Sequence, residues 1–256
     1  DVDFTDGTAT GGAAATGTTD YVSTSQTLTF VGTANETQQF TVVLNEDAIV
    51  EANETFTLAM SNLTPATAPA SSIDVTDAAT GTINNNDSAA VTIEDVTVNE
   101  GTGTITLTAT LDNAVQGGFD VDVVFGDISA IGGTDFANTT QTLTFAGNVG
   151  EAQDITLAIT TDNLVEGTET FGLMMANLSP ATAPAGQIDV TDTATATITD
   201  DDTATWSLSG PSTVAEGANA SYTIALGGVL QTNETATIEV SQTNGTAAND
   251  DRGDFI

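Results

Sequence analysis

Cysteine, histidine and lysine are absent from this 256-residue chain, and Arg252 is its only basic residue. Without cysteine the chain forms neither disulfides nor thiolate zinc sites, so its stability must come from its core, its neighbours or bound cations. Without histidine, cysteine and lysine it lacks the usual nucleophile–base pairs and the lysine of a phosphate-binding loop. We therefore expect that the protein is not an enzyme.

The scarcity of positive charge leaves the chain strongly acidic, with 36 Asp and Glu residues and a formal net charge of −35. Such a charge keeps a protein soluble but makes it self-repelling. It also repels nucleic acid, because nucleic-acid binding depends on Lys and Arg at the phosphates. No apolar run approaches the roughly 18–20 residues of a membrane span. We expect no nucleic-acid partner and no direct membrane insertion.

What the chain does contain is an internal repeat. Residues 26–30 (QTLTF) recur at 141–145, and residues 62–70 recur with one substitution at 177–185, in each case 115 positions later (141 − 26). Three units are predicted: residues 1–87, a repeat that lacks its first strands (the first repeat); residues 88–202, a complete repeat (the central repeat); and residues 203–256, the N-terminal part of a third repeat. We interpret the chain as part of a much longer array.

Apolar and polar residues alternate along the central repeat. Ile105, Leu107, Ala109 and Leu111 share one face of a predicted strand, with threonines on the other face. The same period of two recurs at residues 91–98, 119–125, 143–145, 155–159, 171–175 and 194–198, and no segment has a sustained helical period. About seven short strands separated by turns are typical of an immunoglobulin-like sandwich. The sequence therefore predicts an all-β fold of tandem immunoglobulin-like antiparallel β-sandwiches.

The acidic residues of the central repeat gather where loops are expected to meet at one end of the sandwich. They are Glu100, Asp135, Asp162, Glu166, Glu169, Asp200, Asp201 and Asp202, and the Leu164 carbonyl lies among them. Ca²⁺ takes about six to eight such oxygen ligands, and carboxylates held together repel unless cations neutralise them. The acids could instead be solvated loop ends, and paired carboxylates can also hydrolyse glycosides. Metal binding explains the complete set better.

Four motifs of the central repeat resemble the Calx-beta domain. They are Val98-Asn99-Glu100-Gly101, the Gly-Thr-Asp-Phe of residues 133–136, the segment DNLVEGTETF at 162–171 and the Thr-Asp-Asp-Asp of residues 199–202. The resemblance covers essentially all of 88–202 and most of 1–87. It implies an immunoglobulin-like sandwich that binds several Ca²⁺ ions at one end, with the eight acids above and the Leu164 carbonyl as ligands. Thr161 stands where the family often has a further acid, which implies one ion fewer.

The other two repeats carry less complete sets. The first repeat offers Asp20, Asp47, Glu51, Glu54 and Asp87, but Asn84, Asn85 and Asn86 replace most of the closing acidic run. Because Asn contributes no charge, we expect fewer or weaker ions there. The third repeat keeps only Glu216 and Asp254, so its site cannot be completed within the chain.

These features favour a calcium-stiffened stalk of a large, secreted, extracellular cell-surface adhesin, including adhesins of gliding bacteria. Asp200–Asp202 ends one repeat and Thr203 opens the next with no linker, so a cation there would fix the joint. The expected partners are neighbouring repeats of the same chain and an unidentified cell-surface or matrix ligand. The alternative is a carbohydrate- or protein-binding module of a secreted multidomain protein. Trp206 is the only Trp, and its place on an opening strand predicts core or joint packing rather than a sugar platform.

Overall fold

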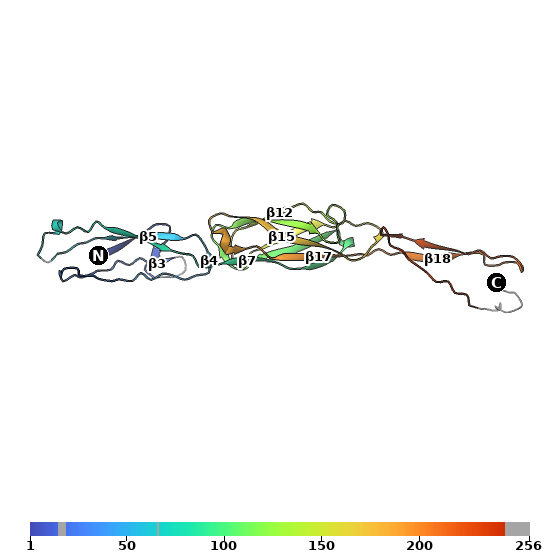
Figure 1. Ribbon diagram of the computed structural model, residues 1–256, viewed down its shortest axis with the longest axis horizontal. Helices are drawn as coiled ribbons and strands as arrows, with labels where there is room; N and C mark the ends of the chain where they lie inside the picture. Colours follow the sequence, from blue (N-terminus) through green and yellow to red (C-terminus); the bar gives the residue numbers. More distant parts are fainter. Residues whose placement is uncertain (15–18, 66, 244–256) are drawn as a thin grey trace.

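The computed structural model describes residues 1–14, 19–65 and 67–243 of the chain. Its strands form three bodies in a row, with the first repeat at one end, the central repeat in the middle and β18 of the third repeat towards the other end (Figure 1). The helices among the described residues are three short 3-10 turns, and none of them has the length or apolar character needed to cross a membrane.

The central repeat is a two-layer β-sandwich, as the alternation predicts. One sheet has the strand order β12-β11-β15-β17-β8, and the facing sheet has the order β13-β9-β7-β16. The elements are β7 (Ala89–Ile93), β8 (Val96–Asn99), η2 (Glu100–Thr102), β9 (Thr104–Leu111), β10 (Ala114–Val115), β11 (Phe119–Asp127), β12 (Gln141–Phe145), β13 (Ala152–Ala158), β14 (Leu164–Val165), β15 (Glu169–Pro180), η3 (Ala185–Gln187), β16 (Ile188–Asp189) and β17 (Thr193–Thr199).

The opening segment of this repeat contributes to both sheets, since β7 lies in one and β8 in the other. At the crossover the Asp192 carboxylate accepts the Ile93 amide N–H at 2.8 Å, and the Asp95 carboxylate accepts the Thr195 N–H at 2.7 Å. As a result β8 runs parallel to β17, and β7 runs parallel to β16. The alternating sequence led us to expect antiparallel strands only. The parallel pairs could not be predicted, because a period of two gives the buried face of a strand and not its direction.

The core follows the predicted alternation. On β9 the burial pattern alternates residue by residue, and Ile105, Leu107, Ala109 and Leu111 are at most 3% exposed. Fully burying an aliphatic side chain of this size contributes about 1.5–3 kcal/mol, so these inward residues hold the two layers together. The outward threonines suit a solvated strand face because they are both β-branched and polar.

A stacked aromatic pair lies at the acidic end of this core. Phe136 and Phe171 stack with their ring centroids 3.9 Å apart, and both are fully buried. Phe136 directly follows Asp135, and Phe171 lies two residues after Glu169. Tyr21 and Phe56 form the same pair in the first repeat, at 4.4 Å. The buried rings therefore anchor the chain segments that carry predicted metal ligands.

The first repeat is less complete. Its elements are β1 (Val2–Asp6), β2 (Gly11–Gly12), β3 (Tyr21–Val22), β4 (Ile49–Val50), β5 (Glu54–Met60), η1 (Ala70–Ser72) and β6 (Ala78–Ile83), with one three-stranded sheet in the order β1-β5-β6. Residues 37–43, the counterparts of β13, form no strand, and Val31 and Val43 are 82% and 55% exposed. In the central repeat β13 pairs with β9, and the counterpart of β9 would precede Asp1. Among the described residues, therefore, no strand equivalent to β9 pairs with residues 37–43.

The third repeat, over its described residues, contains β18 (Thr205–Ser209), β19 (Thr223–Gly227) and β20 (Val229–Leu230). β18 and β19 form a two-stranded antiparallel sheet. Trp206 on β18 is 41% exposed, so the predicted core or joint packing of its ring is not seen. The physical reason is that no second layer faces this sheet within the described residues.

We predict that Phe136→Ala selectively loosens the acidic end of the central repeat. Removing a buried, stacked ring costs about 3–5 kcal/mol. Ile128→Ala is the matched control because Ile128 is 63% exposed, and surface changes stay within about 0.5 kcal/mol. Hydrogen exchange of the β15 amides measures the effect within this repeat. Equal exchange rates in the two variants would contradict the role assigned to the aromatic pair.

Candidate metal centre

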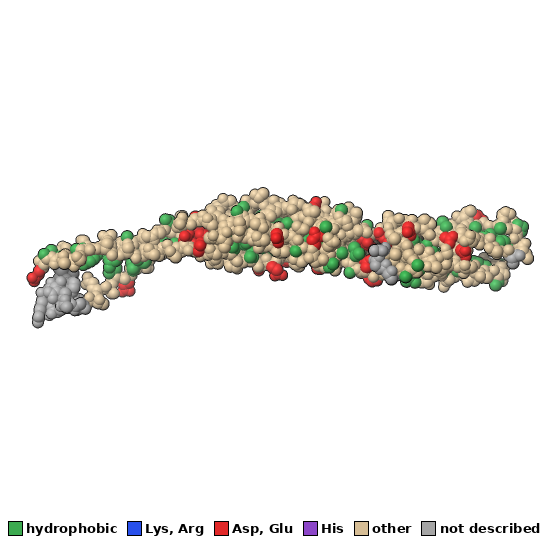
Figure 2. All heavy atoms as spheres, turned by 180° about the vertical axis from the view of Figure 1, so that it is seen from behind, with side chains coloured by type: hydrophobic (Ala, Val, Ile, Leu, Met, Phe, Trp, Pro, Cys, Tyr) green, Lys and Arg blue, Asp and Glu red, His purple; other side chains and the backbone are tan. Residues whose placement is uncertain are grey.

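Most of the acidic side chains that the sequence singles out line two hollows at the junctions between repeats. Other acidic side chains lie along much of the surface (Figure 2). One group lies at the end of the central repeat that faces the third repeat, and we call it the central-repeat site. The other lies at the end of the first repeat that faces the central repeat, and we call it the first-repeat site. Each is a small hollow lined mainly by polar side chains.

Strand register explains why residues far apart in sequence meet at the central-repeat site. β8 and β17 are parallel and pair Asn99 with Thr199, so Glu100 and Asp200 leave the sheet side by side. β15 pairs Glu169 with Ile198 on the other side of β17, which brings Glu169 to the same edge. One end of the sheet therefore brings together three acids from three chain segments.

A capped turn holds Glu100 in place. The Asn99 side chain accepts the Gly101 amide N–H at 3.0 Å, which caps the 3-10 turn η2. The turn ends at Gly103, whose φ of 69° is left-handed and therefore favours glycine. Gly103 then accepts the Ile159 N–H at 3.0 Å through its carbonyl. This contact ties the turn to the segment that continues into Asp162.

Most of the predicted ligands converge. The hollow is lined by Glu100, Asp135, Thr160, Asp162, Glu166, Gly167, Glu169, Ile198 and Asp200. Carboxylate oxygens of Glu100, Asp200 and Asp202 lie within 4.8 Å of one another. Asp201 is exposed and is not part of this triad, but its carboxylate lies against Gly101, the residue that follows Glu100. Leu164 pairs with Val229 of the third repeat and is not among the described residues that line the hollow.

The burial of these acids indicates that they need a positively charged partner. Glu100 is 5% exposed and is the only buried charged side chain among the described residues. Asp202 Oδ2 is also buried and has no hydrogen-bond partner within the described part of the chain. Buried carboxylates normally have a hydrogen-bond or charge partner, and an oxygen without one indicates a missing ion or water. The sequence offers no basic side chain for this role except Arg252, which lies outside the described residues.

The carboxylates raise one another's pKa. Burial, followed by the charges of Asp162 and of the run Asp200–Asp202, raises the pKa of Glu100 to about 7. Burial and the nearby Asp135 and Glu166 raise the pKa of Glu169 to about 7. Burial and then Asp162 likewise raise the pKa of Glu166. A cation would reverse this effect, since positive charge favours the ionised form of each carboxyl group.

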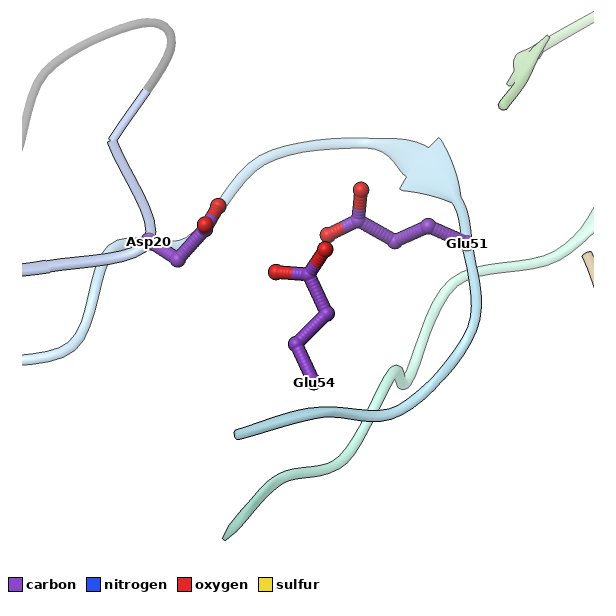
Figure 3. A group of neighbouring side chains, drawn as sticks. All are labelled: Asp20, Glu51 and Glu54. Carbon is purple, nitrogen blue, oxygen red and sulfur yellow. The ribbon is translucent and has the colours of Figure 1, made fainter. Parts of the chain in front are cut away.

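The first-repeat site has the same design with a different residue set. The carboxylates of Asp20, Glu51 and Glu54 point towards one another (Figure 3), and their oxygens lie within 4.8 Å. Asp47 and Asp87 line the same hollow, so all five predicted acids come together. The hollow is lined by Asp20, Asn45, Glu46, Asp47, Glu51, Ala52, Glu54, Ile83, Asn84, Asn85, Asn86 and Asp87.

One acid of this site was missed by the sequence analysis. Glu46 lines the hollow and stands 115 positions before Thr161, the place where the family pattern implies a further acid. The repeat offset alone could have found it. The Asn86 side chain donates to the Glu46 carboxylate at 2.8 Å, and Asn86 stands 115 positions before Asp201.

Burial and repulsion also mark the first-repeat site. Burial, Asp20 and then Glu51 raise the pKa of Glu54 to about 7, and Glu54 Oε2 is buried without a hydrogen-bond partner among the described residues. Burial and then Asp47 raise the pKa of Glu51 and of Asp87. Both sites therefore combine convergent acids with an orphaned buried oxygen.

The third repeat adds no comparable group within its described residues, 203–243. Glu216 lies in an exposed turn, and Asp254 falls outside the described residues. Both other sites receive a glutamine from the repeat that follows. Gln116 donates to Glu51 at 3.3 Å, and Gln231 donates to Glu169 at 3.3 Å. Neither glutamine belongs to the acidic pattern from which the sites were predicted.

Comparison with known proteins gives one family and several structures. The family model for the Calx-beta domain matches residues 2–95 and 82–202. A crystal structure of the apo-form Calx CBD1 domain shares 22% identity with a TM-score of 0.39, over 45% of this chain and all of that one. The CBD12 structure from CALX1.2 shares 24% identity with a TM-score of 0.39, over 44% of this chain and 46% of that one. No curated protein sequence gives a significant match.

The two family matches overlap and together extend from residue 2 to residue 202, well over half of the chain. They include every acidic residue of both sites described above. This chain therefore belongs to the Calx-beta domain family and contains its domains in tandem.

Proposed function

We propose that the repeats bind Ca²⁺ at both junctions and that the bound ions stiffen the chain into a stalk of an extracellular cell-surface adhesin. The observation that carries the proposal is the convergence of carboxylates on buried, unpartnered oxygens at each junction. An acidic cluster alone would be a solvated surface. A 5%-exposed Glu100 and an orphaned Asp202 oxygen require a positive partner or a proton.

The donor set fits a hard cation. All the side-chain donors are carboxylates, with amide oxygens available at Asn84–Asn86, and such oxygen-only sites suit Ca²⁺ rather than softer metals. Glu100, Asp200 and Asp202 would hold an ion in the central repeat, with Asp135, Asp162, Glu166 and Glu169 beside them. Asp20, Glu51 and Glu54 would do so in the first repeat. Membership of the Calx-beta family supports this choice of ion.

The place of the sites supports a mechanical role. Repulsion between unbalanced carboxylates at a junction drives the flanking loops apart, and a bound cation replaces that repulsion with attraction. Extracellular calcium, at about millimolar concentration, would fill even weak sites. The strong negative charge and the lack of the usual catalytic side chains fit a non-catalytic, secreted segment of a surface protein.

We predict that Glu100→Gln lowers Ca²⁺ affinity while sparing or raising the stability of the metal-free protein. The variant removes a ligand charge, for which we expect a loss of at least about 10-fold in affinity, and it also removes a source of repulsion. Glu94→Gln is the control because it makes the same change at an exposed acid outside the site. Isothermal titration and chelator-treated denaturation measure the two effects. An equal loss of affinity in both variants would refute the assignment.

We also predict that the pH dependence of stability changes sign with calcium. In metal-free protein the pKa values of Glu54, Glu100 and Glu169 are raised to about 7, so the folded state binds these protons more tightly than the unfolded state. The resulting stabilisation is complete below an unfolded Glu pKa of about 4.3 and is lost as the pH rises to about 7. With excess Ca²⁺ the ion requires ionised ligands, so stability rises over the same range.

Denaturation curves at pH 5 and pH 8, with metal-stripped and with calcium-loaded protein, measure both slopes. If the metal-stripped protein were more stable at pH 8 than at pH 5, the clustered carboxyl groups would not carry raised pKa values.

The stiffening itself is tested by small-angle X-ray scattering of the complete chain. We expect a longer maximum dimension and a narrower distance distribution in millimolar Ca²⁺ than in chelator, because the junctions lose their freedom to bend. Mg²⁺ at the same concentration controls for general charge screening. An unchanged maximum dimension would end the stalk proposal, even if calcium binds.

A further inference from the structure

The two junctions share a contact that the acidic pattern does not explain. In the first junction, Ile49–Val50 (β4) of the first repeat pairs in parallel with Ala114–Val115 (β10) of the central repeat. In the second, Leu164–Val165 (β14) pairs in parallel with Val229–Leu230 (β20) of the third repeat. All four positions repeat at the 115-residue offset, so the contact belongs to the repeat and not to one junction.

In the first junction this contact is part of a hydrophobic core. Val50 is fully buried and belongs to the core cluster of the central repeat, although it lies in the first repeat. Its pairing partner Val115 is 2% exposed. On the other side, the Val115 N–H donates to the Gly147 carbonyl at 2.9 Å, and a Cβ at Gly147 would stand 1.9 Å from the Val115 carbonyl oxygen. The docking strand is therefore fixed within its own repeat.

A glutamine of the following repeat completes each junction. The backbone N–H of Gln116 donates to the Val50 carbonyl at 2.8 Å, and the backbone N–H of Gln231 donates to the Val165 carbonyl at 3.0 Å. The side chain of the same glutamine then reaches a site acid, Glu51 or Glu169, at 3.3 Å. The backbone bonds have ordinary lengths, and the side-chain bonds are at the long end of the range, but their carboxylate acceptors strengthen them.

The two parts meet on one short loop. Val50, which enters the core of the next repeat, directly precedes Glu51, which belongs to the first-repeat triad. A shift of this loop that separates Val50 from Val115 also moves Glu51 away from Asp20 and Glu54. Docking of the next repeat and assembly of the acidic site therefore depend on the same backbone.

We propose that Gln116 and Gln231 are positioning residues, through which each repeat sets the metal affinity of the repeat before it. This inference rests on the proposed calcium binding and adds a direction to it. The first-repeat site depends on a residue of the central repeat, and the central-repeat site depends on a residue of the third. The occupant of each docking surface is the next repeat of the same chain.

The test titrates Ca²⁺ into variants of the 256-residue chain in which one site dominates. In a Glu100→Gln background, which leaves the first-repeat site, Gln116→Leu should weaken binding about 10-fold, as losses of hydrogen-bond partners of metal ligands do. In a Glu54→Gln background, which leaves the central-repeat site, Gln231→Leu should do the same. Gln38→Leu is the control, because Gln38 is exposed in the first repeat and its side chain donates to Glu36, outside the site.

Unchanged affinity in Gln116→Leu would overturn the proposal, and so would an equal loss in Gln38→Leu. A second arm needs no metal. In chelator, Val50→Ala should speed hydrogen exchange at Val115 and Gln116 by about 10-fold or more, whereas Val43→Ala should not, because Val43 is 55% exposed. If the unmodified chain binds no Ca²⁺, the proposed function fails. The docking contact is then judged by exchange alone, and equal rates in the two valine variants would refute it.

Discussion

The structure depends on the electrostatic repulsion between carboxylates that the fold forces together. Strand register places Glu100, Glu169 and Asp200 at one sheet end, and no lysine or histidine exists anywhere in the chain to balance them. Most acidic proteins avoid this cost by spreading their charges over the surface. Here the repulsion between carboxylates is concentrated at the ends of the repeats. Burial of the apolar core holds the acids close together, and a bound proton or cation must offset their negative charge.

The two sites do not depend on equally complete cores. The central repeat closes two full sheets and buries an aromatic pair beneath its acids. The first repeat keeps the corresponding pair and its acidic triad, even though most of its second layer forms no strands. The site is therefore carried by the segments around Tyr21, Phe56 and the loop at 47–54. These segments need little of the rest of the sandwich to bring the acids together.

Sequence patterns predicted those parts of the structure that local chemistry determines. The alternation at Ile105–Leu111 indicates both a strand and its buried face, and the 115-residue offset identifies two equivalent sets of acids. The parallel pairing of β8 with β17 was not predicted, because it arises from a change of sheet at Glu94–Asp95. The sequence also does not tell which two of the three consecutive Asp residues join Glu100 in the triad. Consecutive residues point in different directions, and a run of three Asp does not reveal which two face inward.

The burial of Val50 in the core of the next repeat affects how a chain of such repeats folds and unfolds. A repeat that completes its core with a side chain from the preceding one cannot reach full stability before that neighbour is in place. Coupled units of this kind behave as a one-dimensional cooperative system, in which interior copies are more stable than terminal ones. During synthesis the amino-terminal copy forms first and offers a template to each successor. In a chain of such repeats, unfolding would therefore start at a terminal copy, which lacks one neighbour, before it reaches the interior copies.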